Sequence, residues 1–301
     1  MATATTAVTG GVTSVEHKKR RHGAQQQDGS SSAVAHGLLL DQFPTDVLAQ
    51  ILAFTSPLDA ARSSAVSHNF RSAAASDAVW DRFLPPDIDA ILSRAIAPVE
   101  FPSKKDLFLR LSARPILIDG GDASFALERS SSKKCLMLSA RQLRIAWGDD
   151  ARYWTFTPTH ESRFGEVAEL LAVWWFDLSG VIATTSLSPR ATYGAFLVFQ
   201  LREHAAGFRS PAQEASVHVG AQAAETLVAL QRPRRGMMIG AEEVRTPRRR
   251  EDGWMEIEMG RFLNDHEDGS TVHVRFHQVR EMNYKTGLIV QGIEFRPVIS
   301  Q

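Results

Sequence analysis

The sequence predicts an α+β protein in which a small N-terminal helical domain is followed by an antiparallel β-sandwich of the jelly-roll type. Between residues 38 and 83, apolar residues recur at helical spacing in short runs that begin at capping residues. From residue 134 onward the period falls to two, and turn residues separate many short segments. Short strands with irregular connections are typical of a sandwich. We therefore divide the chain into residues 1–35, 36–84, 85–103 and 104–301.

The composition is that of a globular protein with a substantial core, since 44% of the 301 residues are apolar and 23% are charged. The 34 basic residues balance the 34 acidic ones, so no net charge favours a nucleic acid or an anionic membrane as partner. The single cysteine, Cys135, excludes an intramolecular disulfide and indicates a reducing compartment. The first residues lack the pattern of a secretory signal, and no apolar run has the length of a membrane span. We expect a cytoplasmic or nuclear protein.

Residues 1–35 are rich in Ala, Thr, Gly, Gln and Ser and hold almost no large apolar side chains. Such a segment cannot bury enough surface to offset the entropy of ordering, so we expect it to be disordered. The motif "HKKRRH", His17 to His22, fits two interpretations, a nuclear-import address or a solvated basic cluster.

Residues 36–84 predict a bundle of short helices. In "FPTDVLAQILAF", apolar residues follow Pro44 near helical spacing. Ser56 precedes Pro57 at the start of the next run, Ser67 caps a third, and "SDAVWDRFLPP" forms a fourth. Helices this short need packing partners in water. Their apolar residues therefore serve as the core of the domain or as a surface for a partner, and in so small a bundle some serve as both.

The run "FPTDVLAQILAFTSPLDAARSSAVSHNFRSAAASDAVWDRFLP" resembles the F-box of plant phloem-protein-2-like proteins of the PP2-B type. F-boxes dock on the Skp-type adaptor of a cullin–RING ubiquitin ligase. The sequence departs from the family only mildly, with Phe43 where the family usually has leucine before the proline. The resemblance implies a docking face formed by Pro44, Val47, Leu48, Ile51 and Leu52.

Beyond the bundle, residues 85–103 contain Pro98 and Pro102 and are interpreted as a linker, and "SKKDLFLRLSARP" predicts one more helix. The segment "TYGAFLVFQL" is apolar on both faces, so we expect it at the centre of a sheet. "TVHVRFHQV" and "GWMEIEMG" alternate, and the second places Glu256 and Glu258 on one face. Residues 221–250 show no period and are expected to form a long mobile loop.

Residues 104–297 resemble phloem protein 2 and the Nictaba-like lectins. The resemblance rests on "KKCLMLSARQLRIAWGDDARYW", "ESRFGEVAELLAVWWFDLSGVI", "LSPRATYGAFLVF", "REDGWMEIEMGRF" and "YKTGLIVQGIEFRP". It implies binding of chitin-type oligosaccharides or N-glycan cores, which contain GlcNAc, through Trp147 and Trp154. Related lectins carry glutamates along the strand where this sequence has Thr271, His273 and Gln278.

The stretch "LRIAWGDDARYWTF" places Trp147, Tyr153 and Trp154 around a turn, where the backbone tends to lie at the surface. One interpretation is an aromatic wall for a sugar ring, with Asp149 and Asp150 accepting hydrogen bonds from its hydroxyls. The other is a plug at the end of a sheet. We favour the wall, and we expect at least one of the tryptophans in "LLAVWWFDL", Trp174 or Trp175, to be a core residue.

Catalysis and metal binding are weaker interpretations. Glu256 and Glu258 would lie about 6 to 7 Å apart, as in a glycosidase pair, but any solvated sheet face alternates charges in this way. His273 and His277 would lie about 13 Å apart with Arg275 between them, which is poor geometry for a metal. We therefore expect no catalytic residue, no metal and no cofactor, and we interpret these side chains as solvated.

These observations lead to a functional hypothesis. The chain is expected to be the substrate-recognition subunit of an SCF-type ubiquitin ligase, whose lectin-like domain holds a client, such as a glycoprotein. The alternative is a free cytoplasmic or nuclear lectin with a non-functional F-box. A sugar-processing enzyme is the third and weakest interpretation.

Overall fold

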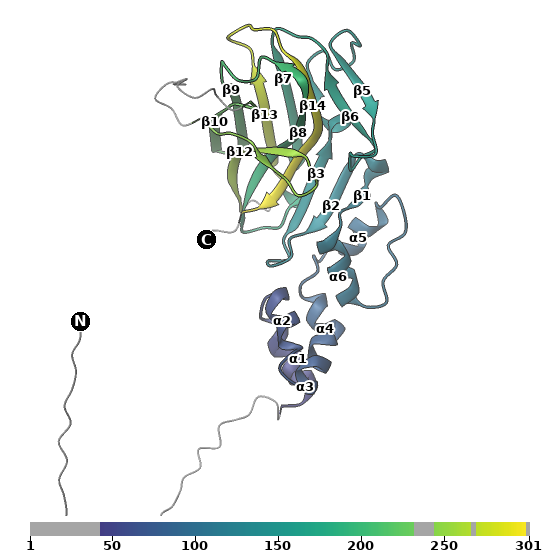
Figure 1. The fold of residues 1–301 in the computed structure, drawn as a ribbon. Coiled ribbons are helices and arrows are strands. Elements are labelled where there is room, and N and C mark those ends of the chain that lie inside the picture. The colour runs from purple at the N-terminus through teal and green to yellow at the C-terminus, as the bar shows by residue number, and fades with distance from the viewer. Residues whose placement is uncertain (1–42, 232–243, 266–268, 299–301) are drawn as a thin grey trace, which may run out of the picture. The chain divides into compact units, whose positions relative to one another are not determined.

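The computed structural model describes residues 43–231, 244–265 and 269–298 (Figure 1). The expected disordered tail, residues 1–35, and the basic cluster at residues 17–22 lie outside this part of the chain. In the described residues, six α-helices precede a series of antiparallel strands, so the predicted α+β class is confirmed. The helices are α1 (Thr45–Ala53), α2 (Pro57–Ser63), α3 (His68–Ala75), α4 (Asp77–Asp81), α5 (Ile88–Ser93) and α6 (Lys104–Ala113).

The first four helices form where the sequence predicts them. The Ser56 side chain accepts a hydrogen bond from the Asp59 N–H at the start of α2, and Ser67 accepts one from Phe70 at the start of α3. Trp80 of α4 is fully buried, and its indole N–H donates to the Ala74 carbonyl at 2.8 Å. A cluster of buried apolar side chains thus holds these short helices together, as their length requires.

Residues 85–103 are ordered and packed, so the expectation of a linker is wrong. Helix α5 lies in this stretch and buries Ile88 and Ile91. Arg94 forms two hydrogen bonds to the Asp119 carboxylate, at 2.8 and 2.6 Å. The prediction of a linker rested on Pro98 and Pro102, but a proline only restricts the local backbone and does not keep the segment from packing. The apolar residues three apart in α5 are what anchor the segment.

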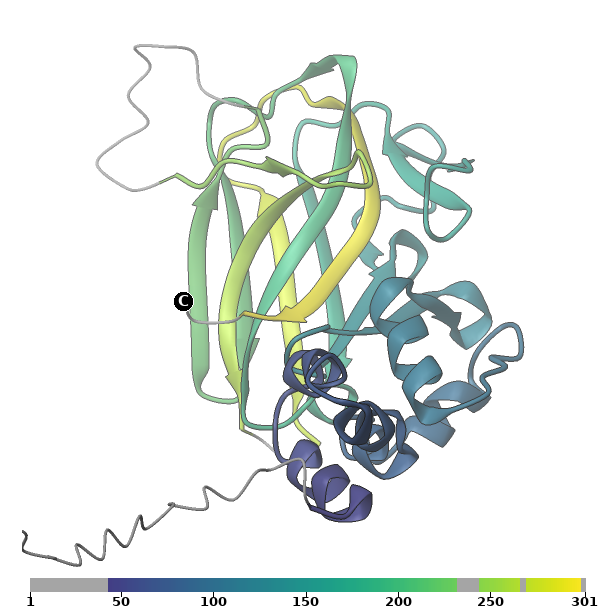
Figure 2. The same cartoon turned by 60° about the horizontal axis from the view of Figure 1, so that its bottom comes forward.

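The strands form two antiparallel sheets that pack face to face (Figure 2). The larger sheet has the order β1-β2-β3-β14-β8-β12-β11, with β6 also paired to β14 and β5 paired to β6. The smaller has the order β10-β9-β13-β7-β4. In the larger sheet the strands are β1 (Ile116–Ile118), β2 (Ala123–Leu127), β3 (Lys134–Ser139), β5 (Trp154–Pro158), β6 (Glu166–Leu170), β8 (Ala191–Ala206), β11 (Arg248–Arg249), β12 (Met255–Asn264) and β14 (Thr286–Pro297). In the smaller sheet they are β4 (Arg144–Ile145), β7 (Phe176–Ala183), β9 (Gln213–Val219), β10 (Gln222–Val228) and β13 (Thr271–Gln278).

Strand β8 contains the segment expected at the centre of a sheet, and it lies between β14 and β12 as predicted. One of its faces contributes Tyr193, Leu197 and Phe199, all fully buried, to the core between the sheets. The facing strand β13 alternates as predicted and contributes Val274 and Phe276 to the same core. This dry interior holds the two sheets together.

The expected loop at residues 221–250 is only partly a loop. Residues 222–228 form β10, which pairs with β9, and residues 248–249 form β11, which pairs with β12. Residues 232–243 lie outside the described chain. The sequence "QAAETLV" lacks a strong period, so its pattern did not predict a strand. It forms β10 at the edge of the smaller sheet, where pairing with β9 holds it in place.

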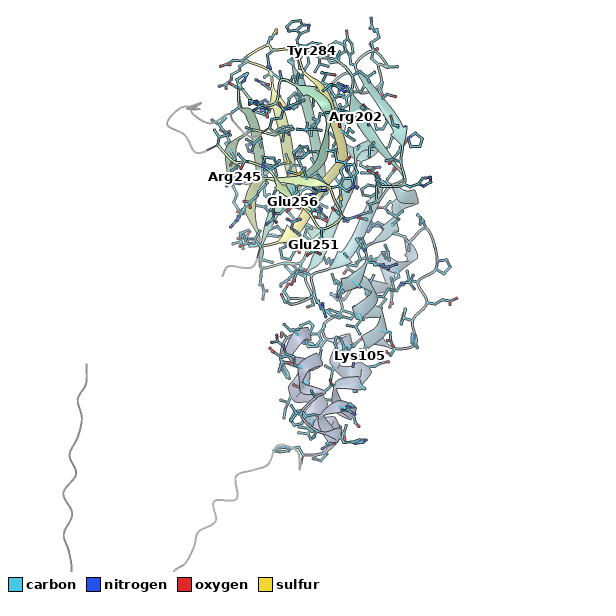
Figure 3. All side chains as sticks on the ribbon, viewed as in Figure 1. Lys105, Arg202, Arg245, Glu251, Glu256 and Tyr284 are labelled. Atoms are coloured by element: carbon cyan, nitrogen blue, oxygen red, sulfur yellow. The ribbon has the colours of Figure 1, made fainter. Side chains whose placement is uncertain are left out.

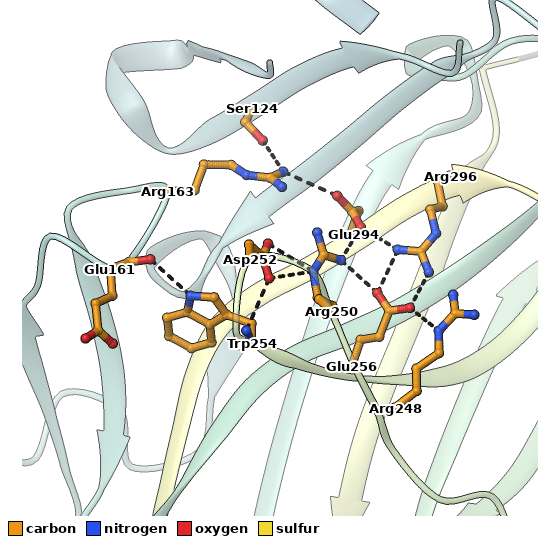
Figure 4. Close-up of polar contacts among 10 residues, drawn as sticks. All are labelled: Ser124, Glu161, Arg163, Arg248, Arg250, Asp252, Trp254, Glu256, Glu294 and Arg296. Atoms are coloured by element: carbon orange, nitrogen blue, oxygen red, sulfur yellow. Dashed lines mark hydrogen bonds and ion pairs between the residues drawn. The ribbon is translucent and has the colours of Figure 1, made fainter. Parts of the chain in front are cut away.

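The outer face of β8 carries Phe196 and Val198, and a group of charged side chains covers this part of the sheet (Figure 4). The Arg296 guanidinium lies 3.7 Å from the Phe196 ring centroid, which is a cation–π contact. Arg296 also donates hydrogen bonds to the Glu256 carboxylate at 2.6 and 2.8 Å. Arg248 bonds to the same carboxylate. The charges therefore form an ordered layer over apolar side chains.

Glu294 lies at the centre of this charged layer and is 7% exposed. Its carboxylate accepts hydrogen bonds from Arg250 at 2.7 Å, from Arg296 at 2.6 Å and from Arg163 at 3.3 Å. Burial raises the pKa of Glu294, but the charges of the arginines outweigh burial and bring the pKa down to about 2. The group is therefore an anion that its arginine neighbours fully compensate.

We predict that Glu294→Gln destabilises the protein by about 3 kcal/mol at pH 7, because it leaves buried arginines without a counter-charge. The folded pKa lies below the ordinary value of 4.5, so the stabilisation is complete above pH 4.5 and is lost as the pH falls toward 2. Denaturant unfolding at pH 7, 4.5 and 3 should therefore show a shrinking difference between wild type and variant. The control is Glu251→Gln at an exposed position in the same region (Figure 3). Equal stability of wild type and Glu294→Gln at pH 7 would contradict the prediction.

Candidate functional site

Five aromatic side chains line one pocket of about 270 Å³ at an end of the sandwich. They come from three regions of the chain: the turn between β4 and β5, the β6–β7 connection and the β13–β14 connection. Figure 3 marks the place of Tyr284 in the last of these. Besides Ala172 and Val173, the lining residues are Trp147, Tyr153, Trp174, Trp175 and Tyr284.

Two aromatic contacts form on the Trp147 side of the pocket and one on the Tyr284 side. The ring centroid of Trp147 lies 5.7 Å from that of Tyr153 and 6.1 Å from that of Trp175. Trp174 and Tyr284 pair edge to face at 5.9 Å. Trp147 and Trp174 remain 53% and 61% exposed, although aromatic rings of this size are usually well buried. Such exposed apolar side chains around a hollow are typical of a ligand site.

The turn before β5 explains why Trp147 is exposed. Trp147 has a φ of 63°, in the left-handed region that few residues other than glycine adopt. The Gly148 N–H donates to the Ile145 carbonyl at 3.0 Å, and the Asp150 N–H donates to the Trp147 carbonyl at 3.0 Å. These bonds hold the turn, so its conformation is enforced by the surrounding backbone. The turn directs the indole outward.

Trp154 is not part of an exposed wall, because it is only 1% exposed and belongs to the core. Trp154 is the first residue of β5, whereas Tyr153 is the last residue of the preceding turn, where its N–H donates to the Asp150 carbonyl at 2.9 Å. The end of this turn places Tyr153 in the lining of the pocket and Trp154 in the interior. For Trp154 the plug interpretation is the correct one, although its indole N–H has no hydrogen-bond partner among the described residues.

Trp174 and Trp175 were expected to supply a core residue, and this expectation is wrong. Trp174 is exposed and Trp175 is half-buried, while Val173 and Phe176 take the buried positions on either side of them. The apolar run suggested a strand, but the pair lies in the connection before β7. Sequence reasoning also missed Tyr284, because this residue lies far along the chain and only the fold brings it to the pocket.

The two carboxylates expected to accept sugar hydroxyls do not line the aromatic pocket. Asp149 is exposed in the turn, and Asp150 bonds to Arg152 at 2.6 Å. Hydrogen bonding to Arg152 lowers the pKa of Asp150 to about 2. The expected role of both residues therefore stays a prediction that the lining of the pocket does not support.

Lys285 holds the two chain segments that carry Trp174 and Tyr284 in place through the hydrogen bonds of its buried side chain. Its side chain is fully buried, and its Nζ donates to the Trp174 carbonyl at 3.1 Å and to the Asn283 Oδ1 at 2.6 Å. Its backbone pairs with that of Val173. Burial lowers the pKa of Lys285 to about 8. One buried ammonium thus ties together the two connections that carry Trp174 and Tyr284.

Two further hollows adjoin the aromatic pocket along the outer face of the smaller sheet. The first, of about 390 Å³, shares Trp175 with the aromatic pocket and is also lined by Arg144 and Asp177. The second, of about 990 Å³, shares Arg275 with the first and extends to His218. The aromatic pocket therefore has neighbouring hollows whose walls carry polar side chains.

The histidines on this face do not form a metal site. His273 and Arg275 are exposed as expected, but His277 is only 8% exposed, so the expectation of a solvated side chain is wrong there. Burial and the charge of Arg275 lower the pKa of His277. Within the described part of the chain, no group of three or more His, Cys, Asp or Glu residues could hold a metal ion.

The carboxylates considered for catalysis are neutralised by arginines. Glu256 is bonded by Arg248, Arg250 and Arg296, and Glu258 by Arg245 and Arg261. Burial raises the pKa of both groups, but their arginine partners reverse the shift and the net pKa is lowered. A glycosidase general acid needs a raised pKa. This pair therefore does not meet that requirement.

The docking face expected on α1 is divided between core and surface. Leu48 and Leu52 are 0% and 3% exposed and pack inside the bundle, so their assignment to the docking face is wrong. On the neighbouring face Pro44 is exposed, Val47 is half-buried and Ile51 is 44% exposed. The two stripes lie one residue apart on the helix, and sequence periodicity does not tell which of them faces the other helices.

Phe54 extends the exposed stripe; it belongs to the apolar run that follows Pro44, but the docking face implied by the resemblance did not include it. It follows Ile51 by three residues and is 82% exposed, which is unusual for phenylalanine. Val66, in the connection between α2 and α3, is 67% exposed. The spacing of Val47, Ile51 and Phe54 is i, i+4 and i+7, a signal that could have identified the stripe.

Two other features have no role in these sites. Cys135 lies on β3, and burial raises the pKa of its thiol, so it is not a reactive thiolate. Among the helices of the described residues, none combines the length and apolar character needed to cross a membrane.

Comparison with known proteins identifies both parts of the chain. The phloem protein 2 family model matches residues 133–297, and the F-box domain model matches residues 40–82. The chain is 40% identical over 264 residues to F-box protein At2g02240 of Arabidopsis thaliana, covering 87% of this chain and 81% of that protein. It is 41% identical over 260 residues to F-box protein PP2-B10 of the same organism, covering 85% and 93%.

Among solved structures, a family 35 carbohydrate-binding module from Clostridium thermocellum aligns with a TM-score of 0.31 and 8% identity. The alignment covers 54% of this chain and 96% of that chain. A similarity this weak supports no conclusion about fold or ligand.

We predict that truncation of Trp154, the first residue of β5, costs much more stability than truncation of Trp147 in the turn before it. Trp154→Ala should cost about 3 to 5 kcal/mol of stability, because it leaves a large cavity in the core. Trp147→Ala should change stability by less than about 1 kcal/mol, because the side chain is half exposed. Thermal and denaturant unfolding of both variants check the prediction, and similar losses in the two variants would contradict it.

Proposed function

Because the chain belongs to the family of F-box proteins that carry a phloem protein 2 domain, we propose that it is a non-catalytic substrate-recognition subunit of an SCF-type cullin–RING ubiquitin ligase. In this role the helices bind a Skp-type adaptor and the sandwich holds the client. Catalysis of ubiquitin transfer then belongs to other subunits, and this chain raises the effective concentration of client lysines near the conjugating enzyme. We propose the cytoplasm or nucleus as the place of action.

The exposed stripe on α1 supports adaptor binding. Val47, Ile51 and Phe54 form a row of apolar side chains beside a core that Leu48 and Leu52 already complete. Phe54, at the C-terminal end of α1, exposes 82% of its surface to water, which is unfavourable for an apolar side chain, and a partner that covers the ring would remove this cost. This observation favours a functional F-box over the alternative of a free lectin whose F-box no longer binds.

The aromatic pocket supports binding of a glycan on the client. Sugar rings have an apolar face of C–H groups that packs on aromatic planes, and their hydroxyls need polar partners nearby. The contacting pairs Trp147–Trp175 and Trp174–Tyr284, which line the same pocket, supply the planes. The adjoining hollow supplies Arg144, Asp177 and Arg275 as polar partners. We propose a GlcNAc-containing glycan as the ligand, and the two aromatic pairs that line one pocket are the single observation that carries this proposal.

We predict that the double variant Ile51→Asp, Phe54→Asp loses adaptor binding by about 100-fold or more, because it places two unpaired charges in an apolar interface. Both side chains are exposed, so the variant should keep its fold. A binding assay with purified Skp-type adaptor measures the affinity, and circular dichroism measures the fold.

Ile96→Asp is the matched control, because Ile96 is also exposed, at 56%, but lies outside the α1 stripe. Undiminished adaptor capture by the double variant would show that this stripe is not the docking face. Absence of adaptor binding by the wild type would instead favour the free lectin.

We predict that Trp147→Ala and Trp175→Ala each weaken binding of chitotriose by about 1 to 3 kcal/mol, because each removes an aromatic contact from a formed pocket. Calorimetric titration measures the affinity, preceded by a glycan array to find the best oligosaccharide. Leu109→Ala, at an exposed position on α6, is the control. If the wild type binds an oligosaccharide and both tryptophan variants bind it equally well, the pocket is not the glycan site.

A further inference from the structure

A further hollow, of about 420 Å³, lies where the end of the F-box region meets the sandwich. It shares no lining residue with the aromatic pocket or with the two hollows beside that pocket. Its volume falls within the range of about 300 to 1,000 Å³ that is usual for small-molecule sites. Four segments of the chain line it: residues 82–87, residues 131–134, residues 184–189 without 186, and Asn264.

Much of the lining is apolar and firmly held. Phe83 and Leu84 are each 6% exposed, and Leu187 is 1% exposed, so these walls belong to the packed interior. Pro85 and Pro189 add rigid apolar surface. A ligand with an apolar body would therefore enter a site that is already formed.

Asn264 supplies an unused hydrogen-bond acceptor in this wall. Its side chain is 1% exposed, and its Nδ2 donates to the carbonyls of Thr184 at 3.2 Å and Ser188 at 2.9 Å. These two bonds set the orientation of the amide, since only the NH₂ group can donate to carbonyl oxygens. The Oδ1 atom is buried and has no hydrogen-bond partner among the described residues.

Asp87 and Lys134 supply a second, incomplete polar group. The Asp87 Oδ2 accepts a hydrogen bond from the Lys134 Nζ at 2.7 Å, while the Oδ1 is buried without a partner in the described structure. The Lys134 Nζ also donates to the Thr185 carbonyl at 3.4 Å. An ammonium group has three hydrogens, so one remains for a further acceptor.

The position of Lys134 is fixed by its backbone. Its N–H donates to the Ser188 Oγ at 3.0 Å, and its carbonyl accepts from the Tyr193 hydroxyl at 2.9 Å. The side chain of Lys134 is only 7% exposed. The buried Lys134 ammonium is therefore fixed in place, and its 2.7 Å contact orients the carboxylate of Asp87, whose side chain is 43% exposed.

We propose that this hollow binds a small organic molecule that has an apolar ring system and a hydroxyl group. A hydroxyl both donates and accepts, so it completes the pair by donating to the Asp87 Oδ1 and accepting from the Lys134 Nζ. A second donor on the ligand would reach the Asn264 Oδ1. Buried acceptors without partners are unfavourable, so a ligand that supplies these bonds gains affinity over one of equal shape that does not.

The site has a structural consequence for the whole chain. A molecule bound there contacts residues 82–87, at the end of the F-box region, and three segments of the sandwich at once. Binding therefore stabilises the connection between the adaptor-binding and client-binding parts of the chain. The inference is independent of the proposed function, since neither an adaptor nor a glycan enters it.

The test uses the full chain and two probes of matched shape, 2-naphthol and 2-fluoronaphthalene. Saturation-transfer NMR and fluorescence titration measure their affinities. We expect 2-naphthol to bind saturably and 2-fluoronaphthalene to bind about fivefold or more weakly, because it lacks the hydroxyl hydrogen bonds. Thr185→Trp, at an exposed lining position, should block the hollow and weaken 2-naphthol binding by about tenfold or more.

Ala90→Trp is the control, because Ala90 is exposed on α5 and does not line the hollow. This variant should bind 2-naphthol as the wild type does. Absence of saturable 2-naphthol binding would overturn the proposal and leave water as the partner of the free oxygens. Binding that Thr185→Trp leaves unchanged would place the probe elsewhere, and equal affinity for both probes would overturn the role of the hydroxyl. Thermal unfolding of Thr185→Trp confirms that the variant is folded.

Discussion

The structure depends on one constraint, the need to cover both faces of β8. This strand is apolar on both sides, so neither face can be left in water. The smaller sheet covers the inner face, and the arginine–carboxylate layer centred on Glu256 and Glu294 covers part of the outer face. Next to that layer, β6 pairs with β14 and carries β5 with it. This arrangement places Tyr153 and the β6–β7 connection beside Trp147, and so the aromatic pocket is a product of covering the central strand.

Both candidate binding surfaces are formed by side chains that lie next to core residues in the sequence but are not buried in the core. Where the turn meets β5, Tyr153 lines the pocket and the next residue, Trp154, is buried in the core. In α1 and at its C-terminal end, Leu48 and Leu52 are buried, while Ile51 and Phe54 are exposed. Neighbouring residues thus serve stability and recognition separately, and within α1 the helical period sends adjacent side chains in different directions. A ligand-facing residue can then change with little effect on the fold.

The buried polar groups fall into two kinds that differ in how completely they are paired. Around Glu294 every carboxylate oxygen has an arginine partner, and Lys285 likewise bonds to acceptors on two connections. Such complete groups hold elements in place. Around Asp87 and Asn264, acceptor oxygens remain without partners in a hollow wide enough for a small molecule. Complete pairing is typical of a structural role, whereas the unpaired oxygens beside this hollow are the basis on which we propose a small-molecule ligand there.

The sequence by itself determined the features that depend on local order. The capping serines of α2 and α3, the central position of β8 and the alternation of β13 follow from residue type and period. The motifs that identify both family domains are local as well. The tertiary structure alone decided which side chains of each element are buried against the rest of the protein. It placed Trp154 inside and Trp174 outside, ordered residues 85–103 through Ile88 and Ile91, and brought Tyr284 to Trp174. The physical reason is that periodicity defines the faces of an element, whereas burial depends on partners distant in the chain.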